Sequence, residues 1–478
     1  MNSKYDVVII GAGIGGLICG CYLVKAGLKV LIVEQHSKPG GYCTSFRRDG
    51  YYFDVGVRYL GSLREGGPLR RILKDLSLWD DITFIRNDPC DRIIVPDKSI
   101  FIRANYKETI EELIINFPKE KNNIINFFDF IFNNNFLTFL SKVRNLTFEE
   151  LLNNFFKDHK LISILSIPLG NLGLPPSQIS ALVSIILYKE YILDGGYYPR
   201  GGIQILPDLI ASRFKLYGGE ILYNVSAQKI FVKNKTINGI GINNEFIKTK
   251  IVVSNCDART TFKDLVECDC REKTVVDKLM PSTSAITLYL GLDNKLENIT
   301  PAHYTTWFFS TYDVEECYGG QNDVLFWVSN IRYLICDFPS LVDVTLAPKN
   351  KSILKILLGI KEFDLNLWEI HKQKLIEKIF MKINKLIPNI QNFIEIMEIA
   401  TPFTFNKFTS NLDGALFGWA STKNQVERNI LPQITSIKGL YLVGHWTTCG
   451  VGQGGITQVA LSGEYGAKII NREIQKVS

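Results

Sequence analysis

Short apolar runs typical of strands and longer segments typical of helices alternate along the chain, most clearly in the first sixty residues. Residues 5–10 (YDVVII) and 29–33 (KVLIV) are short apolar runs, typical of strands that are buried on both faces of a parallel sheet. Residues 17–26 lie between them and have the length and character of a helix, entered through the glycine-rich run G-A-G-I-G-G. The pattern therefore predicts a strand, a glycine turn, a helix and a second strand.

Short apolar or alternating runs between turn residues predict further strands. They are residues 51–55, 220–223, 227–232, 239–243, 246–248, 250–254, 285–292, 323–329 and 439–443. Asp49-Gly50 is expected to be a tight turn, and Asn238-Gly239 is expected to join two of these strands.

Helical periodicity is strongest in residues 108–165, where phenylalanine occurs six times within residues 127–139. After a Leu-Pro-Pro break, Ser177 is the expected N-cap of a nearly apolar helix that ends at Ile192. Other helices are predicted at residues 69–76, 209–217, 375–386 and 457–470. The apolar helices either form the core of a domain, line an apolar tunnel or dip into a membrane surface.

Strand–glycine–helix units stand at both ends of the chain, and a run of short strands stands in its middle. The simplest fold is of the α/β class, with a Rossmann-like nucleotide-binding domain that is assembled from discontinuous segments. We expect this domain to comprise residues 1–100, 195–280 and 430–478. An inserted α+β substrate-binding domain with apolar helices would then comprise residues 101–194 and 281–429.

The glycine run has the chemistry of a dinucleotide site. Gly11 permits the tight turn, Gly13 lets the backbone approach a pyrophosphate, and Gly16 lets helix and strand pack closely. The helix N-terminus then presents free N–H groups to the phosphates. Glu34 ends the second strand, where a carboxylate can accept hydrogen bonds from a ribose. Two flanking strands and an acid at this distance favour a nucleotide site over a glycine turn without a ligand.

Composition narrows the function classes. The chain has 478 residues, of which 46% are hydrophobic and 21% charged, as expected for a globular protein. Its net charge of +6 is small for this length and gives no reason to expect nucleic-acid binding. Ten cysteines without C-x-x-C spacing and five scattered histidines favour reduced thiols and argue against a metal centre. No run of eighteen apolar residues occurs, so we expect a cytoplasmic protein without a transmembrane helix.

Seven motifs occur in a fixed order along the chain. They are G-A-G-I-G-G with Glu34, P-G-G-Y-C-T-S-F, G-Y-Y-F-D-V-G, G-G-Y-Y-P-R-G-G, V-S-N-C-D-A-R-T-T-F, L-Y-L-G-L and G-L-Y-L-V-G-H-W-T. In these motifs the chain resembles the phytoene desaturase group of FAD-dependent oxidoreductases, which includes carotenoid desaturases, carotenoid isomerases and retinol saturases within the amine-oxidase-like superfamily. The resemblance is thinnest in residues 108–193 and 294–435.

The resemblance implies FAD as the cofactor and a set of residues that contact it. They are Gly11, Ala12, Gly13, Gly16, Glu34, Gly40, Gly41, Val225, Gly444, His445, Gly454, Gly455 and Ile456. Two positions depart from the group. Tyr42 stands where the group often has Arg or Lys, and His445 stands where it often has Asp. His445 is expected either to titrate near neutral pH beside the cofactor or to serve only as a hydrogen-bonding residue of its loop.

The resemblance also implies chemistry on the C–C single or double bonds of a hydrophobic polyene or isoprenoid, by desaturation, saturation or isomerisation. Arg58, Tyr59 and His445 are the candidate catalytic residues, followed by Asp54 and Glu190. Two alternatives stay open: a flavin amine oxidase or porphyrinogen-type oxidase, and a non-catalytic lipid-escort protein that resembles the Rab GDP-dissociation inhibitors. A substrate of this class makes peripheral contact with a membrane an expected property.

Overall fold

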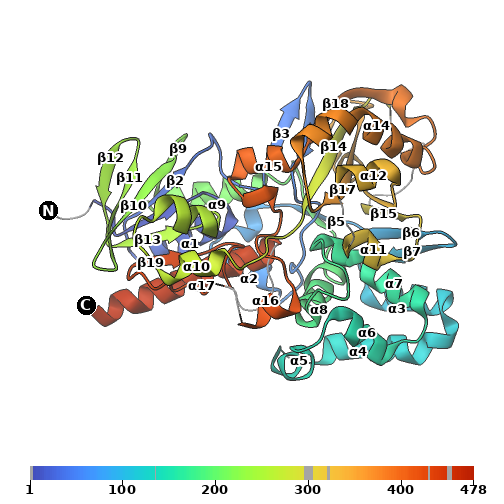
Figure 1. The fold of residues 1–478 in the computed structure, drawn as a ribbon, viewed down its shortest axis with the longest axis horizontal. Helices are drawn as coiled ribbons and strands as arrows, with labels where there is room; N and C mark the ends of the chain where they lie inside the picture. Colours follow the sequence, from blue (N-terminus) through green and yellow to red (C-terminus); the bar gives the residue numbers. More distant parts are fainter. Residues whose placement is uncertain are drawn as a thin grey trace.

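Two β-sheets, one in each half of the molecule, organise the fold (Figure 1). The computed structural model describes residues 4–134, 136–294, 296, 305–319, 323–428, 431–448 and 455–477. The half that carries both chain ends is built on a five-stranded sheet with the strand order β19-β13-β1-β2-β9, and all of its pairings are parallel. Its strands are β1 (Val7–Ile10), β2 (Val30–Glu34), β9 (Glu220–Tyr223), β13 (Ile251–Ser254) and β19 (Leu440–Leu442).

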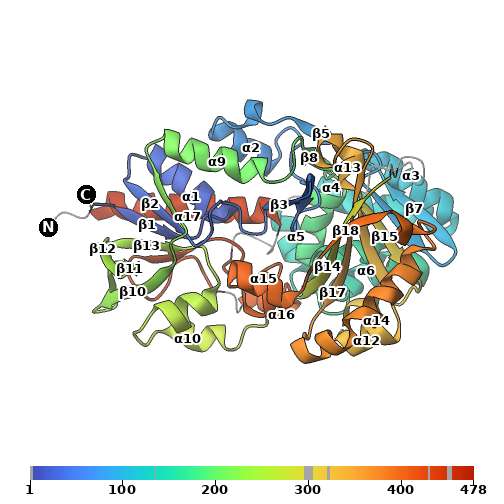
Figure 2. The ribbon, with the colours of Figure 1, turned by 90° about the horizontal axis from the view of Figure 1, so that it is seen from above.

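Alternate residues of this sheet pack on opposite layers. Val7 and Ile9 face the helices α1 (Ile14–Lys25), α9 (Ile205–Leu216) and α17 (Ile456–Val477). Val8 and Ile10 face a three-stranded antiparallel sheet on the other side (Figure 2). Its strands are β10 (Ala227–Lys233), β11 (Thr236–Ile242) and β12 (Glu245–Lys248). The continuous apolar runs in β1 and β2 follow from burial on both faces.

The other half is built on a seven-stranded sheet with the order β18-β14-β17-β16-β15-β6-β7. Its strands are β6 (Asp91–Val95), β7 (Lys98–Ile102), β14 (Ser284–Leu292), β15 (Thr305–Phe309), β16 (Tyr333–Asp337), β17 (Ser352–Ile360) and β18 (Ile394–Ala400). Leu288 and Leu358 face helices α12 (Val324–Ser329) and α14 (Leu365–Ile383). Tyr289 faces the hairpin of β3 (Ser45–Arg48) and β4 (Tyr51–Asp54) on the opposite side.

A group of helices packs beside this second sheet (Figure 1). They are α3 (Tyr106–Asn116), α4 (Lys121–Asn133), α5 (Phe136–Val143), α6 (Phe148–Phe155), α7 (His159–Ser166), α8 (Ala181–Leu187) and the π-turn η4 (Tyr188–Ile192). The remaining elements are α2 (Pro68–Asp75), β5 (Phe84–Arg86), β8 (Tyr197–Pro199), the π-turn η5 (Thr260–Leu265), α10 (Arg271–Val276), α11 (Val314–Gly319), α13 (Pro339–Val342), α15 (Pro402–Thr409) and α16 (Lys423–Arg428). Short 3-10 turns span Trp79–Asp81, Pro118–Glu120, Ile167–Asn171, Val344–Leu346, Ile390–Phe393 and Leu412–Gly414.

The α/β fold class and the helical character of residues 108–165 are confirmed, and Asp49-Gly50 is the turn of the β3–β4 hairpin. Three local predictions are wrong. Residues 323–329 form helix α12, because the Asp323 side chain accepts the Phe326 N–H and caps the helix. The Asn238-Gly239 pair lies inside β11. Ser177 caps no helix; its hydroxyl donates to Glu315, and α8 starts four residues later.

The turns that join β10, β11 and β12 show why the Asn-Gly prediction failed. They fall at Asn234-Lys235 and Asn243-Asn244, and all four of these residues have positive φ. Asparagine tolerates this left-handed conformation and can replace glycine in a tight hairpin turn. The domain boundaries near residues 100, 195, 280 and 430 stay predictions. Within the described part of the chain, no helix combines the length and the apolar character that a membrane span requires.

One buried carboxylate joins α17 to α2. Glu464 has 2% of its side chain exposed and accepts hydrogen bonds from both Nη atoms of Arg71, at 2.8 and 2.6 Å, and from Lys468 Nζ at 2.7 Å. Burial alone would raise the pKa of Glu464, but these charged donors lower it below the ordinary glutamate value. The ion pair therefore stabilises the packing of the C-terminal helix.

We predict that Glu464→Gln lowers the free energy of unfolding by about 1–3 kcal/mol at pH 7, because Arg71 loses its charged acceptor. A lowered folded-state pKa gives stability that is present above the unfolded pKa and is lost as the pH falls through the folded value. Chemical denaturation should therefore show the deficit of the variant shrinking below about pH 4. Glu473→Gln, which breaks the exposed pair with Lys476 on the same helix, is the control and should cost less than about 1 kcal/mol. Equal losses in the two variants would contradict this role.

Candidate functional site

A continuous cavity of about 640 Å³ is lined by residues from both halves of the molecule. One end is lined by the carboxyl edge of the five-stranded sheet and the other by the seven-stranded sheet. Its volume falls in the usual range for small-molecule and cofactor sites. Helix α15 lies between the two halves in both views and contributes Phe405 and Phe408 to the wall (Figures 1 and 2).

Four residues mark the carboxyl edge of the five-stranded sheet in strand order. Gly444 follows β19, Asn255 follows β13, Gly11 follows β1 and Glu34 ends β2. All four line the cavity. Neighbouring strands are about 4.8 Å apart, so this row spans roughly 14 Å, a distance suited to an extended ligand such as a dinucleotide.

The glycine loop leaves room for a ligand at the start of α1. A Cβ atom on Gly16 would lie 2.2 Å from the carbonyl oxygen of Gly11, so only glycine fits in this turn. Gly13 is the N-cap of α1 and makes no side-chain cap, and Gly13 and Ile14 line the cavity. The first N–H groups of the helix therefore face a space in which a phosphate can accept from them.

Glu34 is buried at the end of β2, and both of its carboxylate oxygens accept backbone hydrogen bonds. Oε2 accepts the Ala12 N–H at 2.7 Å, and Oε1 accepts the His36 N–H at 2.9 Å. Each oxygen keeps a further lone pair, so hydroxyl groups of a ribose can still donate to it. The Val225 N–H donates to the Glu34 carbonyl at 2.9 Å, and Val225 lines the same end of the cavity.

Asn255 fills the space that several glycines leave open, and sequence reasoning missed it. Its backbone N–H donates to the Ile10 carbonyl at 2.9 Å and fixes the residue at the sheet edge. Cβ atoms on Gly13, Gly15 and Gly444 would lie 2.9, 2.6 and 2.6 Å from its side-chain amide. The amide therefore holds the N-terminal and C-terminal glycine turns together. Its position directly after a buried strand, in V-S-N-C-D, was the available signal.

The Gly-Gly turn after β2 lies against the glycine loop. Gly40 pairs with Gly13 in a parallel bridge and has a φ of 133°, and a Cβ atom there would lie 2.4 Å from the Cys43 carbonyl oxygen. Gly40 and Gly41 both line the cavity. Tyr42 lines it too, and its hydroxyl donates to the Ala415 carbonyl at 3.1 Å. Burial raises the pKa of Tyr42 to about 12, so a neutral phenol stands where the resembled group often has a cation.

The C-terminal loop completes the row at the sheet edge. Gly444, Gly455 and Ile456 line the cavity, and Gly444 and Gly455 have φ values of 92° and 76°. Gly454 lies outside the described residues. Ala12 and Gly16 belong to the glycine loop but do not line the cavity.

His445 lines the cavity in a neutral form. Its ring packs edge-on against Trp446, with the ring centroids 5.4 Å apart, and its Nε2 lies 3.5 Å from the Asn411 amide nitrogen. Burial lowers the pKa of His445 to about 4. The expectation that His445 titrates near neutral pH is therefore wrong. At pH 7 its ring is uncharged and can donate one hydrogen bond and accept another.

Arg58 and Tyr59 both border the cavity, and one buried carboxylate organises them. The Arg58 guanidinium lies 4.7 Å from the ring centroid of Trp307 and contacts the Asn171 side chain. Asp91 accepts from the Tyr59 hydroxyl at 2.7 Å and from Trp307 Nε1 at 2.8 Å. Burial raises the pKa of Asp91, and burial together with Asp91 raises that of Tyr59. The Nη1 atom of Arg58 is buried without a hydrogen-bond partner in the described part of the chain.

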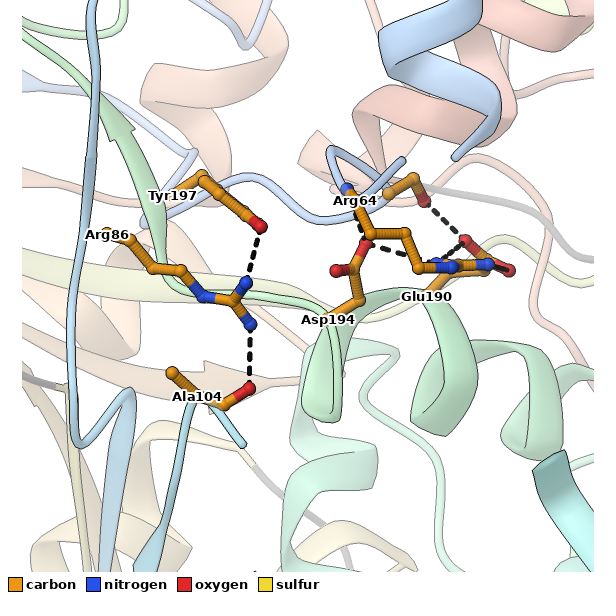
Figure 3. A network of polar contacts seen from close by, with 7 residues as sticks. Arg64, Arg86, Ala104, Glu190, Asp194 and Tyr197 are labelled. Carbon is orange, nitrogen blue, oxygen red and sulfur yellow. Dashed lines mark hydrogen bonds and ion pairs between the residues drawn. The ribbon is translucent and has the colours of Figure 1, made fainter. Parts of the chain in front are cut away.

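Asp54 and Glu190 do not border this cavity. Asp54 accepts hydrogen bonds from Ser45, at 2.6 Å, and from the Tyr198 hydroxyl, beside a separate pocket of about 30 Å³. Glu190 forms an ion pair with Arg64, which Figure 3 shows together with Asp194. Both carboxylates are thus engaged in structural contacts.

The other end of the cavity is a sheet surface whose side chains are mostly apolar. Trp307, Ile335, Leu357 and Thr287 are paired in one row across β15, β16, β17 and β14. The last three of these residues line the cavity. The Thr287 hydroxyl is buried and has no hydrogen-bond partner among the described residues. The row therefore begins at Trp307, which carries the Arg58 guanidinium, and ends at Thr287 with its unpaired hydroxyl. The described residues contain no group of three or more His, Cys, Asp or Glu side chains that could hold a metal ion.

The lowered pKa of His445 generates a pH prediction. Between the ordinary histidine pKa of about 6.5 and the folded value of about 4, the unfolded chain binds a proton that the folded chain does not, so stability falls as the pH drops through this window. His445→Gln removes this effect. Denaturation curves should show wild type losing up to about 3 kcal/mol relative to the variant between pH 7 and pH 4. His159→Gln, at an exposed position, is the matched control. A constant difference across this range would contradict the burial of a neutral ring.

Comparison with known proteins places the chain among enzymes. A sequence model described as an NAD(P)-binding Rossmann-like domain matches residues 9–76. An all-trans-retinol 13,14-reductase of Danio rerio is 24% identical over 92% of this chain and 82% of its own length. Prolycopene isomerase 2 of an Oncidium hybrid, a chloroplastic protein, is 27% identical over 96% of this chain and 83% of its own.

Solved structures share the fold. An oxidoreductase from Methanosarcina mazei has a TM-score of 0.70 at 18% identity and covers 97% of this chain and 99% of its own. Putrescine oxidase bound to putrescine has a TM-score of 0.67 at 13% identity, with coverages of 98% and 99%. A Rab GDI from Plasmodium falciparum has a TM-score of 0.54 at 14% identity, with coverages of 84% and 89%. The chain is thus homologous over nearly its whole length to retinol reductases and prolycopene isomerases, which confirms its resemblance to the phytoene desaturase, carotenoid isomerase and retinol saturase group.

Proposed function

We propose that this chain is an FAD-dependent oxidoreductase that acts on C–C single or double bonds of a hydrophobic polyene or isoprenoid, by desaturation, saturation or isomerisation. One observation carries the proposal. A single continuous cavity joins the nucleotide-type edge of the five-stranded sheet to the largely apolar surface of the seven-stranded sheet. A cofactor at the first end and an apolar chain at the second would therefore meet without crossing solvent.

The residues at the sheet edge fit FAD in the order in which its parts are joined. Glu34 can accept from the ribose, and the uncapped start of α1 at Gly13 can donate to the pyrophosphate. The rest of the molecule would then extend past Asn255 toward Gly444 and the C-terminal loop. When bound, FAD supplies the acceptor or donor of a hydride equivalent.

The sheet surface at the other end fits an apolar chain. Ile335 and Leu357 offer aliphatic surface between the ends marked by Arg58 and Thr287. Leu172 and Leu187 contribute further aliphatic lining from the helical region. Such aliphatic walls would exclude water from a substrate cation spread along conjugated bonds. Tyr59 borders the cavity and donates its hydroxyl proton to Asp91, and we infer that this pair could pass a proton to or from the chain.

The charge of the cavity argues against an amine substrate. The acidic residues in its lining are Glu34 and Asp264, which lie at the nucleotide end beside β2 and β10, among the described residues. At the other end the ionic group is the Arg58 guanidinium, which would repel an ammonium ion. A lipid-escort function would need no hydride chemistry, so the flavin content of the protein separates it from the proposed enzyme.

Peripheral membrane contact remains part of the proposal. Phe403 and Phe408 on α15 have exposures of 56% and 54%, and Phe408 also lines the cavity. Exposed aromatic residues next to the cavity would suit the transfer of an apolar substrate from a membrane surface.

The proposed function predicts that the purified protein binds FAD and exchanges reducing equivalents with polyenes. Anaerobic incubation of the oxidised enzyme with a panel of polyenes should bleach the flavin if the enzyme desaturates, and reduced enzyme should be reoxidised if it saturates. Isomerisation would change the polyene spectrum without a net change in the flavin. A saturated isoprenoid of equal length, which has no allylic bond, is the control. Failure to bind FAD, or the absence of all three responses, would overturn the proposal.

A second prediction tests the substrate end of the cavity. Leu357→Trp adds bulk to the sheet surface, so kcat/KM for the polyene should fall by about 10-fold or more because the chain no longer fits. The Kd for FAD should change by less than about 2-fold, since the nucleotide edge is untouched. Leu325→Trp, at a residue of α12 that is 44% exposed, controls for the substitution itself. If Leu357→Trp leaves kcat/KM for the polyene unchanged, the substrate binds elsewhere.

A further inference from the structure

Tyr191 connects the helical region to the start of the C-terminal helix. It lies on the π-turn η4, directly after α8, and lines the cavity. Its hydroxyl oxygen accepts the Thr457 N–H at 3.1 Å, which is one of the first N–H groups of α17. The phenol thus occupies a helix N-terminus that would otherwise be free to receive an anionic part of a ligand.

The loop opposite Tyr191 is shaped to admit the phenol. A Cβ atom on Gly455 would lie 2.7 Å from the Tyr191 hydroxyl oxygen and 3.1 Å from the ring carbon that bears it. Any other residue at this position would push the ring away from α17. Gly455 also lines the cavity, so the contact between loop and phenol lies at the cavity wall.

Glu190 and Asp194, which flank Tyr191 in the chain, form an ion-pair clamp with Arg64; Figure 3 shows these three residues. The Arg64 guanidinium donates to both oxygens of Glu190 at 2.8 Å and to Asp194 at 3.0 Å, and the Arg64 N–H donates to Asp194 at 3.2 Å. The Ser62 hydroxyl adds a bond to Glu190 at 2.9 Å. The two carboxylates have side-chain exposures of 13% and 7%, so the clamp is largely shielded from solvent. π-turns often occur at functional sites, and this one is fixed from a separate segment of the chain.

The hydroxyl of Tyr191 retains a proton to donate. Its oxygen already serves as an acceptor for α17, and burial raises its pKa, so the phenol is neutral and protonated at pH 7. The row at the sheet edge runs from Glu34 to Gly444, and Gly444, Gly455 and Tyr191 all line the same cavity. An FAD molecule with its ribose at Glu34 would therefore bring its ring toward this hydroxyl.

We propose that Tyr191 is a cofactor-contacting residue that donates a hydrogen bond to the isoalloxazine ring of FAD, and that Arg64, Glu190 and Asp194 are positioning residues that hold it there. The inference rests on the proposed FAD-dependent function. In this arrangement the Tyr191 hydroxyl lies between α17 and the isoalloxazine ring: it accepts from the Thr457 N–H and would donate to the ring. A donor at this place stabilises the negative charge of the reduced ring, so it makes the bound flavin easier to reduce.

The test uses the full-length protein loaded with FAD and compares Tyr191→Phe with Tyr188→Phe. Tyr188 lies on the same π-turn, and its buried hydroxyl donates to the Leu165 carbonyl away from the cavity lining. Tyr191→Phe should raise the Kd for FAD by about 5-fold, the effect of one lost hydrogen bond, and should shift the flavin absorbance band. Its flavin reduction potential should become more negative. Tyr188→Phe should leave these three quantities at their wild-type values.

Arg64→Lys tests the clamp, because lysine keeps the charge but loses the forked geometry. It should shift the Kd, the absorbance band and the potential in the same direction as Tyr191→Phe and by less. If Tyr191→Phe lowers only the melting temperature, as Tyr188→Phe would, the residue is merely structural and the inference is overturned. If wild type binds FAD normally while Tyr191→Phe retains its affinity, spectrum and potential, the inference fails and the proposed function stands. A wild-type protein that binds no FAD overturns both.

Discussion

The structure depends on a close approach of backbone segments that only missing Cβ atoms permit. At the carboxyl edge of the five-stranded sheet, the turns after β1 and β19 come close enough for one amide side chain, that of Asn255, to touch both. Cβ atoms at Gly13, Gly15 or Gly444 would lie within 3 Å of that amide. Because the sheet is parallel, the carboxyl ends of all its strands lie at one edge, so the turns that follow β1 and β19 meet in the same site.

This constraint explains why the site is divided into a polar end and a largely apolar end. Backbone N–H groups and the Glu34 carboxylate gather where parallel strands end, since that is where unpaired backbone groups and helix N-termini accumulate. The seven-stranded sheet instead presents side chains to the cavity, because its strands lie along the wall with their backbone groups already paired. Aliphatic residues such as Ile335 and Leu357 therefore dominate that wall. The polar residues at the two ends of this wall are Arg58 and Thr287, whose Nη1 and Oγ1 atoms have no hydrogen-bond partner among the described residues.

Sequence reasoning recovered the parts of the site that are local in the chain. The glycine loop and Glu34 lie within one strand–helix–strand unit, so their spacing alone predicts their juxtaposition, and the Gly444 turn repeats the same pattern. It missed Asn255 and Tyr191, because their roles depend on contacts between segments that are far apart in sequence. Tyr191 meets Thr457 across 266 positions. Periodicity also misassigned residues 323–329, where the capping carboxylate of Asp323 selects a helix for a sequence rich in strand-forming residues.

Burial in the folded protein sets the charge state of the ionisable residues at the cavity. A histidine in a glycine-rich loop suggests a titrating group, yet burial leaves the His445 ring neutral at pH 7. Tyr42 likewise presents an uncharged phenol. The Arg58 guanidinium lies over the Trp307 ring beside the apolar sheet surface, and the indole N–H of Trp307 donates to Asp91. Asp91 also accepts from Tyr59, so one buried acid holds an indole and a phenol by hydrogen bonds, and the indole in turn carries the Arg58 guanidinium. Any proton transfer at this wall would then depend on Asp91 as much as on the residue that touches the substrate.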